Sequence, residues 1–187
     1  FMSIYRQLPL IVSFFITTTA FATVVTPATE QEAQLLTQHG LADKTVEEMV
    51  NTIDTSPLAR PLPYRSAVTP NELIIENNGK QYIYPLQEKF YLSFAPFINK
   101  THPCLIHSLS GCQAELTNTT FNVKMNDSEG KSIIDQDMTS GSNGFVGVWL
   151  PRNINGTLEV TYNGKKAQTV IATHRNSQTC LTTLQLK

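Results

Sequence analysis

Three cysteines and two histidines are the residues of this chain best suited to chemistry. The stretch HPCLIHSLSGC, residues 102–112, holds His102, Cys104, His107 and Cys112, while Cys180 lies near the C-terminal end. Thiolates are soft donors that select Cu(I), zinc or iron–sulfur clusters. Three thiolates suit a trigonal Cu(I) site, whereas zinc normally takes a fourth ligand, which one of the histidines could supply. The residue types therefore predict a soft-metal site, provided that the loop and Cys180 meet.

The same cysteines also permit interpretations without a metal. Cys104 and Cys112 could form a disulfide that closes a short loop, with Cys180 as a buried thiol. Alternatively, Cys180 could be bonded to the loop, which would stabilise the fold by roughly 3–5 kcal/mol in the chain-entropy model. Either pairing leaves one thiol free, and the residues leave both open.

Redox chemistry overlaps with metal binding at such thiols. No C-x-x-C motif is present, so a thioredoxin-type active site is not predicted. Thiolates that bind copper can also reduce Cu(II) to Cu(I), because their oxidation to a disulfide supplies the electrons. The chain lacks the hydrolase, zinc-protease, P-loop and dinucleotide motifs. We therefore expect a protein that is not an enzyme, apart from a thiol-dependent reduction of Cu(II).

The elements that position these residues fall into two parts. Residues 27–56 have a helical apolar pattern, with a first helix ending at Gly40 and a second one N-capped by Asp43. The proline-rich stretch 56–66 is predicted to be an extended connector. A β-hairpin follows over LIIENNGKQYIYPL, where Asn78 and Gly79 supply the positive φ angles of a tight turn.

From KFYLSFAPF onward, short alternating segments separated by Gly/Asn turns predict an antiparallel β-sandwich. The expected fold class is α+β: an N-terminal α/β region over residues 23–87 and a β-rich domain over residues 88–187. CLTTLQL is predicted to be its last strand. The cysteine-containing loop and the start of that strand can then meet at one end of the sandwich, where functional loops gather.

The N-terminal 22 residues have the pattern of a secretory signal peptide. Arg6 precedes a short apolar run, and the small-residue site Ala20-Phe21-Ala22 follows. The apolar run is too short to predict a membrane span. Cleavage after Ala22 would give an exported protein in an oxidising compartment, where thiols tend to pair.

Charge excludes some classes of partner. The chain has a formal net charge of −1 at pH 7, and loss of Arg6 with the signal peptide would make it −2. No basic run or stripe is present. Nucleic acid and, after cleavage, membrane surfaces are therefore not expected as partners.

Several segments together resemble the CueP family, the periplasmic copper-binding proteins of Gram-negative bacteria. They are QHGLADKTVEEMVNTID, the H-x-C-x2-H-S-x2-G-C-Q-x-E loop, GFVGVWLPRN and TCLTTLQL, in addition to the signal peptide. The resemblance extends over nearly all of residues 23–187. Its most specific part is the frame of three cysteines.

The resemblance implies that Cys104, Cys112 and Cys180 are the copper-binding, redox-active thiols, with His102 and His107 as further candidate ligands. It implies a periplasmic protein that holds copper as Cu(I), contributes to copper tolerance and delivers copper to a periplasmic Cu,Zn superoxide dismutase. It also implies reduction of Cu(II) to Cu(I) and a periplasmic disulfide isomerase as reductant. The alternative function is a disulfide-stabilised, exported β-sandwich interaction module without metal.

Overall fold

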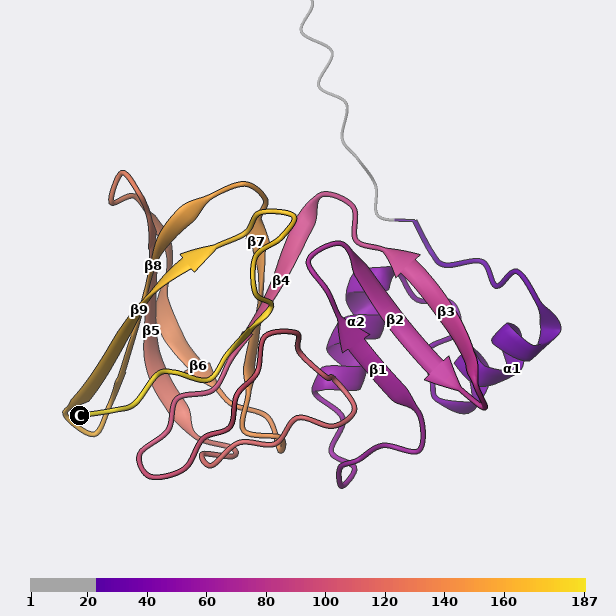
Figure 1. The fold of residues 1–187 in the computed structure, drawn as a ribbon, viewed down its shortest axis with the longest axis horizontal. Helices are drawn as coiled ribbons and strands as arrows, with labels where there is room; N and C mark the ends of the chain where they lie inside the picture. The colour runs from indigo at the N-terminus through magenta and orange to yellow at the C-terminus, as the bar shows by residue number, and fades with distance from the viewer. Residues whose placement is uncertain (1–22) are drawn as a thin grey trace, which may run out of the picture.

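The computed structural model describes residues 23–187, in which two helices are followed by ten strands in three sheets. The signal peptide predicted over residues 1–22 lies outside the described residues. Helices and one small sheet form one side of the molecule, and the remaining strands form the other (Figure 1). The predicted α+β class is confirmed.

The two helices are short, and a threonine side chain caps the N-terminus of each. Helix α1, Glu30–Gln38, is N-capped by Thr29. Helix α2, Val46–Asp54, begins with a capping box in which Thr45 and Glu48 each bond the other's backbone N–H. The prediction that Asp43 caps α2 is wrong: Asp43 has a φ of 57° in the turn between the helices. Thr45 replaces it because the Glu three residues later completes the reciprocal pair.

Strands β1 (Arg65–Val68), β2 (Glu72–Asn77) and β3 (Lys80–Pro85) form an antiparallel sheet against these helices. The β2–β3 hairpin is confirmed, with positive φ at Asn78 and Gly79. Strand β1 begins inside the stretch predicted to be a connector. Its Val68 side chain is buried in the core that contains α2 and β2 residues, which explains the pairing with β2, and Ser66 is buried as well.

The other strands form two facing sheets. One has the order β10–β4–β7 and the other the order β6–β5–β8–β9. Buried side chains from both sheets, among them Phe90, Phe94 and Phe121, meet in one core, as in a sandwich. The bounds are β4 Lys89–Phe94, β5 Thr120–Asp127, β6 Ser132–Thr139, β7 Val146–Pro151, β8 Asn155–Tyr162, β9 Lys165–Ala172 and β10 Cys180–Leu181.

The last strand differs from its prediction in length and direction. Strand β10 has two residues and runs parallel to β4. The alternation beyond it is real, since Leu184 and Leu186 are buried. The ladder becomes irregular after Leu181, because the C-terminal segment contains one extra residue before pairing resumes. The N–H groups of Ala95 and Phe97, two residues apart, donate to the carbonyls of Leu181 and Leu184, three residues apart.

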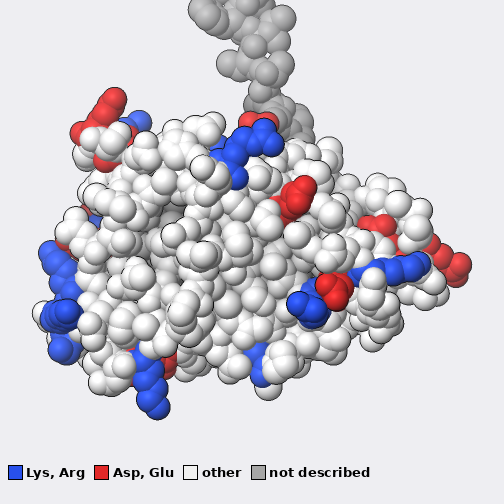
Figure 2. Space-filling view, viewed as in Figure 1, with Lys and Arg blue, Asp and Glu red and all other residues white. Residues whose placement is uncertain are grey.

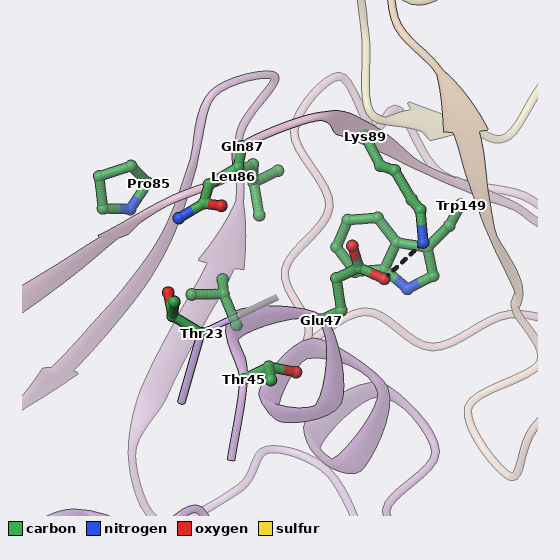
Figure 3. A pocket seen from close by; sticks show the side chains of 9 residues that line it. Thr23, Thr45, Glu47, Pro85, Leu86, Gln87, Lys89 and Trp149 are labelled. Carbon is green, nitrogen blue, oxygen red and sulfur yellow. Dashed lines mark hydrogen bonds and ion pairs between the residues drawn. The ribbon is translucent and has the colours of Figure 1, made fainter. Parts of the chain in front are cut away.

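The two sides of the molecule share a tightly packed junction. Tyr91 of β4 packs into the core under the helices, and Trp149 of β7 donates to Asn51 of α2 over 2.9 Å. A small hollow of about 40 Å³ remains there, beside the 2.9 Å ion pair of Lys89 and Glu47 (Figure 3). Residues on either side of the expected boundary at 87/88 are thus in direct contact.

Charged side chains are sparse on the broad face in Figure 2, where most residues are uncharged and lysines, arginines and carboxylates lie at separate points. Among the residues that the structure describes, neither helix is long and apolar enough to cross a membrane.

Candidate metal centre

Four potential metal ligands come together from two distant parts of the chain. Cys104, His107, Cys112 and Cys180 each offer one donor atom, and these atoms all lie within 4.8 Å of one another. Three of the four belong to the long connection between β4 and β5, which crosses the molecule between its two sides (Figure 1). The fourth begins β10.

Backbone and side-chain hydrogen bonds hold the loop against β1 and the start of β10. The N–H of Val68 donates to the carbonyl of His107 over 2.9 Å, which attaches the loop to β1. Thr179, next to Cys180, accepts from the His107 N–H over 3.0 Å and donates to the Val68 carbonyl over 2.7 Å. Its own N–H donates to the carbonyl of Leu105. The Thr179 hydroxyl therefore links the loop, β1 and β10 beside the sulfur atoms.

A carboxylate closes the base of the loop. Glu115 accepts hydrogen bonds from the backbone N–H groups of Ile98, Asn99 and Lys100. These bonds, that of Asn99 foremost, lower the pKa of Glu115 to about 2. The two ends of the loop that carries the cysteines are thus held together by hydrogen bonds.

Two of the three cysteines form a disulfide. Cys104 and Cys180 are bonded, with their Cα atoms 5.5 Å apart, and Cys112 is free. Of the two pairings that the sequence left open, the one that bonds Cys180 to the loop is present, and the Cys104–Cys112 pairing is not. The Cys112 Sγ lies 3.6 Å from the Cys104 Sγ. Cys180 is completely buried, whereas Cys104 and Cys112 are partly exposed.

His107 lies between the sulfur atoms and a buried carboxylate. Its Nδ1 is 3.7 Å from the Cys180 Sγ, its Nε2 is 2.9 Å from Oδ1 of Asp54, and its ring packs on Phe145. Burial by itself lowers the pKa of His107, but the charge and hydrogen bond of Asp54, with a smaller contribution from Cys112, raise it to about 9. The ring is therefore charged at neutral pH and forms a buried ion pair with Asp54.

Asp54, the last residue of α2, is saturated with hydrogen bonds. Its Oδ2 accepts from the Tyr91 hydroxyl over 2.6 Å, and its Oδ1 accepts from Nδ2 of Asn143 over 2.9 Å. Burial by itself raises the pKa of this carboxyl, but His107 outweighs that effect and the pKa lies below its ordinary value. A Cβ at position 147 would overlap the Tyr91 hydroxyl, so Gly147 provides the space for this arrangement.

Sequence reasoning missed Asp54, Tyr91 and Asn143. A signal for Asp54 was available, because it follows Val46 by eight residues and Val50 by four, on the apolar face of α2. A carboxylate on such a face is rarely buried without a partner. Tyr91 and Asn143 carry no comparable signal, since their role depends on where β4 and the turn before β7 meet α2.

The other histidines of the described residues are not among the four clustered donors. The ring of His102 is 6.1 Å from that of Phe145, and His102 is not one of the four clustered ligands. His174 is hydrogen-bonded to Asn155, and His39 packs against Tyr64. Of the two loop histidines considered from sequence, the structure brings His107 to the cysteines.

A family model and a solved structure of the same family both match this chain. The family model described as periplasmic copper-binding protein CueP matches residues 48–185. The crystal structure of S.CueP is similar, with 55% sequence identity and a TM-score of 0.83, covering 87% of this chain and 100% of that chain. No curated protein matches the chain significantly.

Proposed function

Because this chain belongs to the CueP family of periplasmic copper-binding proteins, we propose that Cys104, His107, Cys112 and Cys180 are the residues that hold its copper. The observation that carries the proposal is the convergence of four soft or borderline donors within 4.8 Å. Thiolate sulfur and imidazole nitrogen in this number favour Cu(I) over hard cations, which prefer oxygen ligands. The copper is cargo, taken up and passed on.

Copper uptake requires the reduced protein. The disulfide occupies two of the three sulfur atoms, and a disulfide sulfur is a far weaker donor than a thiolate. Reduction by two electrons frees Cys104 and Cys180 beside Cys112. We therefore assign the disulfide-bonded arrangement to the oxidised state and the trithiol to the copper-binding state.

His107 is the proposed fourth ligand, in preference to His102. A ligating imidazole must release the proton from the nitrogen that binds metal, and it commonly donates the other to a carboxylate. Asp54 faces Nε2 and the sulfur atoms face Nδ1, so the arrangement favours Nδ1 as the donor. Copper binding would then displace the Nδ1 proton and leave the hydrogen bond to Asp54 in place.

The same cysteines can reduce copper. Two Cu(II) ions each accept one electron, the Cys104 and Cys180 thiolates form a disulfide, and two Cu(I) ions result. The Cys104–Cys180 disulfide is the bond that this step would form. An external dithiol, such as a periplasmic disulfide isomerase, would restore the thiols, which would bind Cu(I) and pass it to a client such as a periplasmic Cu,Zn superoxide dismutase. These steps would contribute to copper tolerance, and without the reductant the protein makes a single turnover and is not an enzyme.

The test is Cu(I) binding by competition with a coloured chelator, for reduced and oxidised protein and for single variants. We expect reduced protein to bind one Cu(I) tightly and oxidised protein to bind none. Cys180→Ser and His107→Ala should each lose affinity, whereas His102→Ala is the matched control and should not. Unaltered binding by Cys180→Ser would refute the four-residue site.

An interaction module without metal predicts the same disulfide and the same free thiol in the oxidised protein. The two functions separate after reduction. A metal-free module would gain two thiols and no copper affinity, whereas the proposed site would gain both. The family match favours the copper function.

A further inference from the structure

A free thiol touches one end of the disulfide. The Cys112 Sγ lies 3.6 Å from the Cys104 Sγ, at van der Waals contact. Thiol–disulfide exchange proceeds by attack of a thiolate on a disulfide sulfur, and contact between the two is its geometric requirement. The three sulfur atoms therefore contain the parts of an exchange reaction as well as those of a metal site.

We propose that Cys112 attacks Cys104 within the oxidised protein, so that the disulfide moves from the buried Cys104–Cys180 pair to the loop pair Cys104–Cys112, where an external dithiol reduces it. In this role Cys112 is the residue through which reducing equivalents enter the site. The inference rests on the proposed function for its purpose, while its chemistry requires no copper.

The exchange step balances without an added oxidant or reductant. The Cys112 thiolate forms a bond to the Cys104 sulfur, the Cys104–Cys180 bond breaks, and Cys180 leaves as a thiolate. The proton that Cys112 gives up on attack is available to Cys180. Nδ1 of His107, 3.7 Å from the Cys180 Sγ, is placed to hydrogen-bond the departing sulfur. One disulfide and one thiol are present before and after the step.

The exchange matters because the two disulfides differ in their exposure to an external thiol. Cys180 is completely buried, with Ala95 and Phe145 packed around it, so an external thiol cannot reach its sulfur. After exchange, both bonded sulfur atoms belong to partly exposed residues of one loop. An external dithiol then attacks the loop disulfide, forms a mixed disulfide, and resolves it with its own second thiol, which leaves all three cysteines reduced.

Proximity decides which thiol reacts first. A thiol held within the same molecule has an effective concentration in the millimolar range or above, roughly a thousandfold more than a micromolar external dithiol. The internal attack therefore precedes the external one. Removal of Cys112 should slow reduction by a protein dithiol about tenfold or more.

Trypsin distinguishes the two disulfides. Cys104 and Cys112 lie in one tryptic peptide, residues 101–124, and Cys180 lies in another, residues 176–187. Oxidised protein is held at pH 8 without oxygen or added thiol, quenched in acid, denatured with a maleimide and digested. We expect linked peptides with maleimide on Cys112, and also a loop-closed 101–124 peptide together with maleimide on Cys180.

A matched control excludes exchange during the work-up. Protein whose Cys112 was alkylated before the incubation should give the linked peptides alone. Linked peptides alone in the untreated protein as well would overturn the proposal.

Two variants complete the test. Cys180→Ser should oxidise to the Cys104–Cys112 disulfide, and failure to form it in folded protein would overturn the proposal. Cys112→Ser retains the Cys104–Cys180 disulfide, and its reduction by a purified protein dithiol should be at least tenfold slower. Equal rates would show that the external thiol attacks Cys104 directly. Exchange without copper binding would refute the proposed function and leave this inference standing.

Discussion

Replacement of Asp54 by asparagine removes the charge that holds His107 protonated. The carboxylate contacts Nε2 of His107 at 2.9 Å, and an amide of the same shape keeps the volume and part of the hydrogen bonding. Burial alone lowers the pKa of His107, so the variant should contain a neutral imidazole at neutral pH. A neutral residue pair in the same space is the smallest change that tests the ion pair.

The magnitude follows from the shift. The pKa of His107 rises from 6.5 to about 9 on folding, and each unit corresponds to about 1.4 kcal/mol. Because the folded-state pKa is the higher one, this stability is fully present below pH 6.5 and is lost as pH rises through 9. Oxidised wild-type protein should therefore lose about 3 kcal/mol of unfolding free energy between pH 5.5 and 9.5 on account of this group. Asp54→Asn should lack that loss.

The assay is urea unfolding of both oxidised proteins across this pH range. The two proteins are compared by how steeply the free energy of unfolding changes with pH. Glu115→Gln is a suitable control, because the pKa of Glu115, about 2, lies far below this range. The pH dependence of the unfolding free energy of this variant should therefore match that of the wild type. Parallel stability profiles for the wild type and Asp54→Asn would refute the buried ion pair.

Three further changes test the surroundings of the site. Gly147→Ala places a Cβ against the Tyr91 hydroxyl and should cost about 1–3 kcal/mol, measured by urea unfolding; an unchanged midpoint would contradict the tight packing. Tyr91→Phe removes a hydrogen bond to the charged Asp54 and should cost about 1.5–3 kcal/mol in the same assay, whereas a cost near zero would mean that water replaces the hydroxyl. Thr179→Val leaves the His107 N–H and the Val68 carbonyl unpaired and should cost about 1–3 kcal/mol, with faster amide exchange at His107; unaltered protection there would contradict its linking role.

Local patterns in the sequence predicted most of the secondary structure. Asn78-Gly79 between alternating segments predicts the β2–β3 hairpin, because positive φ angles at both turn residues are required and these residue types tolerate them. Alternating apolar residues predict the strands of the sandwich for a similarly local reason. The length of the last strand was overestimated because its alternation is a local feature, whereas the regular ladder depends on its register with β4 and is interrupted between Leu181 and Leu184.

The sequence also determined which atoms are available for chemistry, since three cysteines in the family frame predict a soft-metal site before any contact is known. Only the tertiary structure decided their state and surroundings. The Cys104–Cys180 pairing, the position of His107 beside the sulfur atoms, and the carboxylate of Asp54 behind it all depend on contacts between segments at least 53 residues apart. Such contacts follow from how α2, the loop and β10 pack together, and packing is a property of the whole chain that no local spacing records.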